Sequence, residues 1–343
     1  MARIESTFFF ICSHIKKGAM KMDIRIGIAG FGNLGKAALY EARRTPDMTP
    51  VCVITRRDPS FVGKDEDGVT FIRSDDALFM REKVDVLLIC GSSAYDLPRQ
   101  TPSFARDFCV VDAFDTHRKI DEHFSSVDLA ARQSEHSAVI AAGWDPGLFS
   151  LWRLFARAAM PDGAVNTFWG PGVSQGHSDA IRHIEGVTDA VQYTIPQGEF
   201  VSRSAKGDPT AFTDSERIRR LCYVSVKKSA DRDKIAKEIS SMPHYFKEYD
   251  TAVFFVSEEE LAKKHYSLAH QGQVFCSDAD KNSIACSLKT PSNPNLTARL
   301  MLACARAAYR LYSKKEYGCF TMFDIPPALL LPEGKKELRK AFL

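Results

Sequence analysis

The chain has 343 residues, enough for two domains of ordinary size, and 45% hydrophobic with 26% charged residues is a globular composition. A net charge of +3 is too small to argue for nucleic acid or an anionic membrane, and no apolar run approaches the roughly 20 residues that span a bilayer, so neither partner is expected. The nine cysteines form no C-x-x-C pair, which predicts reduced thiols in a cytoplasmic protein.

The first 21 residues are expected to lie outside the folded core. Their apolar stretch, residues 8–12, is too short for a secretory signal, and the basic residues Lys16 and Lys17 follow it instead of preceding it. We therefore interpret residues 1–21 as a non-core extension.

Residues 24–35 predict a strand, a glycine-rich turn and a helix. β-Branched residues stand at every second position of the strand, and Gly30, Gly32 and Gly35 then form G-x-G-x-x-G. The first glycine permits the tight turn, the second lets the backbone approach a pyrophosphate, and the third lets the helix pack closely on the strand. Between a strand and a helix, this motif favours a dinucleotide site over an ordinary turn. Its residues are Gly30, Phe31, Gly32, Asn33, Leu34 and Gly35.

The next expected strand, residues 51–55, ends in a basic pair. Arg56 and Arg57 stand where an NAD-dependent enzyme usually carries an acidic residue for the ribose hydroxyls, and Thr55 adds a hydroxyl group. Guanidinium groups bind phosphate oxygens bidentately. We therefore interpret these residues as a binding site for the 2′-phosphate of NADP. The alternative interpretation is a basic turn exposed to solvent.

Three further buried strands are predicted at residues 84–90, 109–114 and 138–142. The alternation of strands with helices implies a Rossmann-type, doubly wound parallel sheet of the α/β class. The carboxyl ends of such strands face the cofactor, which places there the residues Cys90, Gly91, Ser92, Ser93, Ala113, Phe114 and Asp115.

Two of these strand ends present aspartates, Asp115 and Asp145, close to the expected nicotinamide position. For either aspartate alone, a turn or a helix cap is the alternative role. Pro146 holds Asp145 extended, which favours capping of the following helix.

After residue 150 the pattern changes to that of a second, α+β domain. Residues 167–179 are rich in glycine and hydroxyl residues around one Trp, which predicts a binding loop and not a core element. Alternating strands of an expected mixed sheet lie at residues 191–196, 221–226, 251–256, 273–276 and 283–288. Helices are predicted at 231–242, at 333–340 and at 295–312, the last packing back on the nucleotide domain.

Metal and hydrolase chemistry are not expected. The nine histidines form no ligand spacing such as H-E-x-x-H, and there is no G-x-S-x-G elbow.

Together these motifs resemble the meso-diaminopimelate dehydrogenase family, from about Met22 to near Leu331. The most specific segment is residues 167–179, which read T-F-W-G-P-G-V-S-Q-G-H-S-D. The glycine motif and the arginine pair add to it, as do D-x-F-D-x-H-R at 112–118, G-W-D-P-G at 143–147, A-V-Q-Y-T at 190–194 and N-P-x-x-T-A at 293–298.

The resemblance implies NADP-dependent oxidative deamination at the D-centre of meso-2,6-diaminopimelate. The products would be ammonia, NADPH and L-2-amino-6-oxopimelate, which cyclises to tetrahydrodipicolinate, a precursor of lysine and peptidoglycan. The resemblance also implies a homodimer. Residues 22–142, completed by 295–343, would bind the dinucleotide, and residues 143–294 would bind substrate and form the dimer.

Positions matching the family's substrate contacts are Asp115, Trp144, Asp145, Trp169, Gln175, Gly176, Thr194, Arg220, His270 and Asn293. The chemistry of these side chains fits a substrate with two carboxylates and two ammonium groups. Arginine, histidine, threonine and asparagine donate to carboxylates, and aspartates accept from ammonium groups. Hydride leaves Cα only when the adjacent amine is neutral, so a base or a water relay is needed. Asp115 and Asp145 are the catalytic candidates, and the residues leave open which of them, or a water, takes the proton.

Two alternatives remain from the sequence. One is a broad D-amino-acid dehydrogenase of the same family, and the other is a non-catalytic NADP-binding sensor. The intact set of Asp115, Asp145, Arg220 and His270 argues against the sensor.

Overall fold

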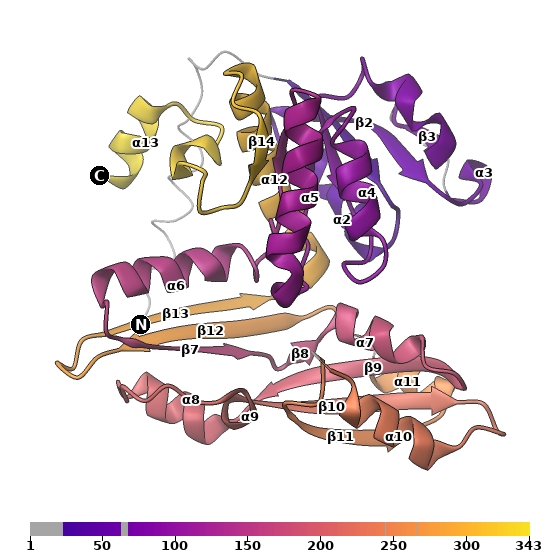
Figure 1. Ribbon diagram of the computed structural model, residues 1–343, viewed down its shortest axis with the longest axis vertical. Helices are drawn as coiled ribbons and strands as arrows, with labels where there is room; N and C mark the ends of the chain where they lie inside the picture. Colours follow the sequence, from indigo (N-terminus) through magenta and orange to yellow (C-terminus); the bar gives the residue numbers. More distant parts are fainter. Residues whose placement is uncertain (1–22, 63–67, 244, 266) are drawn as a thin grey trace, which may run out of the picture.

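The computed structural model describes residues 23–62, 68–243, 245–265 and 267–343. The predicted extension, residues 1–21, lies outside the described residues. The chain forms an upper half around one parallel sheet and a lower half around two smaller sheets (Figure 1). No helix in the described ranges is long and apolar enough to cross a membrane.

The upper half contains a seven-stranded parallel sheet in the order β14-β6-β5-β4-β1-β2-β3. This confirms the predicted doubly wound α/β fold. Its strands are β1 (Ile24–Ala29), β2 (Met48–Thr55), β3 (Thr70–Arg73), β4 (Val86–Ile89), β5 (Cys109–Asp112), β6 (Ser137–Val139) and β14 (Gly318–Phe320). Its helices are α2 (Asn33–Ala42), α3 (Pro59–Val62), η1 (Ser74–Met80), α4 (Leu97–Phe104), η2 (His117–Lys119), α5 (Ile120–Gln133), α12 (Asn293–Ser313), η3 (Pro327–Leu329) and α13 (Lys335–Phe342).

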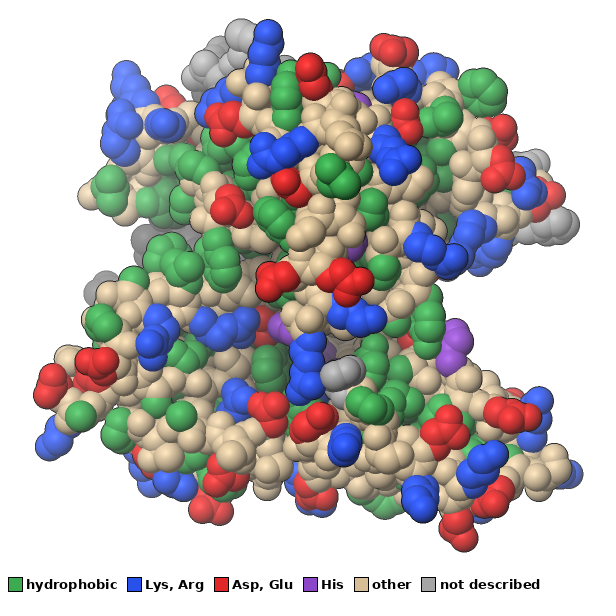
Figure 2. Space-filling view, viewed as in Figure 1, with side chains coloured by type: hydrophobic (Ala, Val, Ile, Leu, Met, Phe, Trp, Pro, Cys, Tyr) green, Lys and Arg blue, Asp and Glu red, His purple; other side chains and the backbone are tan. Residues whose placement is uncertain are grey.

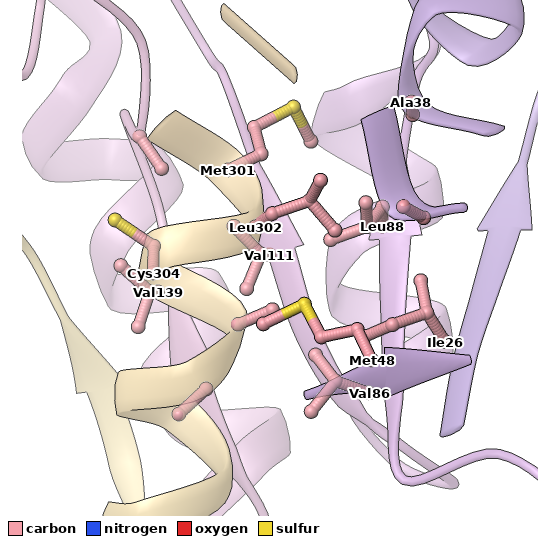
Figure 3. Packing of buried hydrophobic residues seen from close by; sticks show 14 of the residues in the cluster. Ile26, Ala38, Met48, Val86, Leu88, Val111, Val139, Met301, Leu302 and Cys304 are labelled. Carbon is pink, nitrogen blue, oxygen red and sulfur yellow. The ribbon is translucent and has the colours of Figure 1, made fainter. Parts of the chain in front are cut away.

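Both faces of this sheet are buried, because its strands are apolar at nearly every position. Ile24, Ile26 and Ile28 point to the face that α2 and α12 cover, where Met301 and Leu302 of α12 pack against the side chains of the strands (Figure 3). The alternate positions of the strands pack under α4 and α5 on the other face. The alanine-rich helix α12 therefore returns to the nucleotide half, as predicted.

The lower half contains two sheets where one mixed sheet was expected. The sheet β11-β10-β9-β8 is mixed, since β10 pairs parallel with β11 and antiparallel with β9. The strands predicted at 273–276 and 283–288 lie instead in a separate antiparallel sheet, β13-β12-β7. The strands are β7 (Ala164–Trp169), β8 (Gly172–Val173), β9 (Val187–Pro196), β10 (Ile218–Val226), β11 (Asp250–Phe255), β12 (His270–Ser277) and β13 (Ser283–Thr290). The helices are α6 (Leu148–Ala159), α7 (Gln175–Arg182), α8 (Gly198–Ala205), α9 (Asp214–Arg217), α10 (Arg232–Ser241) and α11 (Glu258–Lys264).

The prediction of a binding loop over residues 167–179 is wrong in its local structure. The segment ends β7, forms the short strand β8 and begins α7. Ser174 is the reason that a helix can begin there, because its hydroxyl accepts from the backbone N–H of His177 as an N-cap.

Candidate active site

The glycine-rich turn borders a cavity of about 390 Å³ at the carboxyl edge of the parallel sheet. Gly30 has a φ of +98°, and a side chain at Gly35 would place its Cβ 2.0 Å from the Gly30 carbonyl oxygen. A Cβ at Gly32 would meet nothing within 4 Å, so this side of the turn is open to a ligand. The turn therefore has the close helix packing and the free backbone approach that a pyrophosphate needs.

The basic pair lines the same cavity. Arg57 donates from Nη2 to the carbonyl oxygen of Phe31 at 3.0 Å, and its backbone N–H donates to the Thr55 hydroxyl at 3.1 Å. Arg56 donates from Nη1 to Oδ1 of Asp96 at 2.9 Å. Two guanidinium groups beside an open glycine turn fit a dinucleotide that carries a 2′-phosphate.

One predicted cofactor residue, Phe114, can contribute only its backbone. The Phe114 side chain is buried and stacks on His123, with 4.1 Å between the ring centroids. Leu34 packs against the core of the sheet, and Phe31 packs edge-on against Phe71. A side-chain contact from Phe114 to the cofactor is therefore excluded by its packing.

A buried network that the sequence did not reveal fixes the end of β5. The carboxylate of Asp112 accepts from the Thr101 hydroxyl and contacts Nε2 of His123, both at 2.7 Å. It also accepts from the backbone N–H groups of Phe114 and Ala141 at 3.1 and 3.2 Å. Asp112 thereby ties together the segments after β5 and β6, which carry the predicted catalytic aspartates.

Asp115 follows this network and lies where the two halves of the chain face each other. Its backbone N–H donates to the Ser93 hydroxyl at 3.1 Å, and a Cβ added at Gly176 of α7 would lie 3.8 Å from its Oδ2. The side chain remains open to solvent, yet loss of hydration beside the surrounding protein raises the pKa of its carboxyl. A solvent-accessible carboxylate with a raised pKa is suited to accept a proton.

The Asp145 side chain is buried, and both of its oxygens accept hydrogen bonds from within the protein. Its two oxygens accept from Nη2 and Nη1 of Arg153 at 2.6 and 3.0 Å, and Oδ2 also accepts from Nε1 of Trp169. The alternative role of Asp145 as a helix cap is excluded, because Gly147 is the N-cap of α6. A Cβ at Gly147 would lie 1.9 Å from the Gly143 carbonyl oxygen, so the chain turns too tightly there for any other residue.

A buried guanidinium lies on the adjacent mixed sheet. Arg220 and Thr194 are opposite each other in β10 and β9, and Nη1 of Arg220 donates to the Thr194 hydroxyl at 2.6 Å. The guanidinium lies 4.2 Å from the centre of the Tyr249 ring, and burial lowers the pKa of Arg220. Its buried Nε has no hydrogen-bond partner among the described residues, so it has a donor to offer a carboxylate.

Three other predicted substrate residues form one cluster. Nε1 of Trp144 donates to Oδ1 of Asn293 at 2.9 Å, and the Trp144 and His270 rings are 4.9 Å apart. Burial lowers the pKa of His270, which favours its neutral form near pH 7. Because Asn293 begins α12, this cluster joins the lower half to the helix that crosses the nucleotide sheet.

Contacts between the halves bring the loop after β4 against α7. The Ser92 hydroxyl contacts Oδ2 of Asp179 at 3.4 Å, and the Tyr95 ring lies 4.5 Å from that of His183. Side chains of both charges gather at the waist between the halves (Figure 2). No group of three or more His, Cys, Asp or Glu side chains in the described part of the chain could hold a metal ion.

A parallel sheet with a glycine-rich turn and a basic pocket at its carboxyl edge is the arrangement of an NADP-dependent dehydrogenase. The meso-diaminopimelate D-dehydrogenase of Acetivibrio thermocellus is 48% identical over 332 residues, which are 95% of this chain and 99% of that protein. This chain belongs to the diaminopimelate dehydrogenase family.

Other comparisons agree with this membership. The family model described as "Diaminopimelic acid dehydrogenase C-terminal domain" matches residues 143–289. The solved Corynebacterium glutamicum DAP dehydrogenase in complex with DAP has a TM-score of 0.88 and 35% identity, and covers 94% of this chain and 100% of that one. An engineered D-amino acid dehydrogenase bound to NADP+ matches with the same TM-score and coverage at 34% identity.

Proposed function

We propose that this chain catalyses the NADP-dependent oxidative deamination of meso-2,6-diaminopimelate at its D-centre. The observation that carries the proposal is the division of charge in the site: a solvent-accessible Asp115 for an ammonium group and a buried Arg220 for a carboxylate. The reaction releases ammonia and L-2-amino-6-oxopimelate, and the reverse reaction uses the same groups.

Each of these residues has a distinct role in the proposed deamination. NADP, held by the glycine turn with Arg56 and Arg57, supplies the hydride acceptor when bound. Asp115 takes a proton from the substrate ammonium, which leaves a neutral amine whose lone pair can form the imine as hydride departs. Asp145, neutralised by Arg153, orients the Trp169 indole and the amine instead of exchanging protons. Water then adds to the imine carbon, and ammonia leaves.

Stereochemical selection requires that both ends of the substrate be held. The two centres of meso-diaminopimelate carry the same groups, so a site that bound one end alone could not separate them. We assign Arg220, Thr194 and His270 to the carboxylate far from the nicotinamide, and Asp115 with Asp145 to the reacting D-amine.

The decisive experiment measures NADPH formation with meso-diaminopimelate, LL-diaminopimelate and single D-amino acids. We expect rapid turnover of the meso isomer only. Comparable turnover of simple D-amino acids would favour a broad D-amino-acid dehydrogenase, and cofactor binding without turnover of any of these would favour a sensor.

We further propose a cytoplasmic homodimer formed by the lower half. Leu154 and Phe155 on α6 are 41% and 55% exposed, and hydrophobic side chains gather over this helix (Figure 2). Light scattering should give twice the mass of the chain, and Phe155→Glu should shift it toward the monomer. A wild-type mass of one chain would contradict the dimer.

Loss of either arginine should weaken the binding of NADP but not that of NAD. Charge-assisted hydrogen bonds contribute about 1.5–3 kcal/mol, so Arg57→Ala or Arg56→Ala is expected to raise the Kd for NADP about 10- to 150-fold. The Kd for NAD should change little, because NAD lacks the 2′-phosphate. Calorimetric titration of both cofactors checks this, and an intact preference in both variants would contradict the assignment.

A further inference from the structure

One carboxylate joins two parts of the cofactor cavity. Asp96, at the start of α4, accepts from Nη1 of Arg56 on Oδ1 at 2.9 Å and from the backbone N–H of Ser92 on Oδ2 at 3.1 Å. Its side chain is 14% exposed, whereas that of Arg56 is 69% exposed. Asp96 is therefore fixed beside the loop after β4, and the longer Arg56 side chain reaches across the cavity to it.

The two arginines of the basic pair consequently differ in their electrostatic surroundings. Arg57 donates to a neutral carbonyl group, that of Phe31. Arg56 is paired with the carboxylate of Asp96, which offsets its positive charge. A 2′-phosphate carries close to two negative charges near neutral pH, so it can pair with the Arg56 guanidinium only in competition with the Asp96 carboxylate.

We propose that Asp96 limits the selectivity of this enzyme for NADP over NAD by competing with the 2′-phosphate for Arg56. The inference rests on the proposed phosphate-binding role of Arg56. The competition acts only on the cofactor that carries the phosphate, so it lowers NADP affinity without the same effect on NAD. It also gives Arg56 an alternative partner when NADPH leaves.

The test is the ratio of the Kd for NAD to the Kd for NADP, measured by calorimetry on the whole enzyme. Asp96→Asn keeps the shape and an acceptor for the Ser92 N–H but removes the charge. The ratio is expected to rise about 1.5- to fivefold, the effect of one solvent-exposed ion pair. If Asp96 only supports the loop after β4, both constants change together and the ratio stays constant, which would overturn the proposal. A falling ratio would overturn it as well, because Asp96 would then be holding Arg56 in its binding position.

Two controls separate this proposal from its premise. Asp58→Asn removes the same charge near the end of β2, where the Asp58 carboxylate accepts from Ser60 and not from Arg56, so the ratio should stay near that of wild type. In an Arg56→Ala background, Asp96→Asn should no longer raise the ratio. A rise that persists there, or an equal rise in Asp58→Asn, would contradict competition for Arg56. Wild-type NADP affinity in Arg56→Ala alone would instead refute the phosphate-binding role.

Discussion

Asp115→Asn is expected to lower kcat for meso-diaminopimelate about 10²- to 10⁴-fold, the range for a positioned acid–base group. The Kd for NADP should stay near wild type, because we assign this carboxylate to the substrate and not to the cofactor. Stability should be kept or raised. The ionised form is disfavoured in the folded protein, as its raised pKa indicates, and neutral asparagine removes that cost near pH 7.

The pH profile provides the sharper measurement. A base whose pKa is raised loses activity as the pH falls through that value, so the acid limb of kcat should lie above the ordinary range of an aspartate. This limb should disappear in Asp115→Asn. Asp121→Asn, on the exposed first turn of α5, is the matched control and should behave as wild type. Near-normal turnover in Asp115→Asn would refute its role as the base.

Asp145→Asn should lower both kcat and stability, in contrast to Asp115→Asn. Asparagine presents one acceptor oxygen where the carboxylate presents two, so Arg153 loses the charge that neutralises it in a largely buried position. We expect the free energy of unfolding to fall by about 1–3 kcal/mol. The Trp169 indole loses its orientation at the same time. A misplacement of about 1 Å in the site lowers the rate about 10²-fold, so we expect a loss of this size in kcat.

Thermal unfolding and steady-state kinetics on the two variants separate the two aspartates. Arg153→Met tests the same pair from the other side. It should also lower stability, because it leaves the buried Asp145 carboxylate without its partner. A normal Tm in Asp145→Asn would show that the ion pair does not stabilise the fold. Normal turnover in Asp145→Asn would exclude it from the site.

The fold was predictable where burial leaves a clear pattern. Strands with both faces covered, such as β1 and β4, consist of apolar residues at nearly every position. β3 and β14 were missed because they have only four and three residues, and β3 is partly exposed along its length. The segment 167–179 was misassigned because its glycines and hydroxyl residues resemble a loop, although Ser174 caps a helix within it.

The sequence predicts a set of site residues, but it does not predict which groups their side chains contact. The sequence cannot show that Arg153, eight residues after Asp145, reaches back to neutralise it. Nor does it show that Asp112 turns its carboxylate inward to His123 while Asp115, three residues later, stays open to solvent. Such distinctions depend on side-chain direction, which tertiary packing decides.

The position of α12 has a consequence for how the protein is made. The chain leaves the nucleotide half after β6, builds the whole lower half, and returns only with α12 and β14. A nascent chain that has emerged up to residue 292 therefore lacks Met301, Leu302 and the other α12 side chains that cover one face of the parallel sheet. The nucleotide half therefore completes its packing only after the lower half has been synthesised, and the part of its sheet face that α12 covers stays exposed until then.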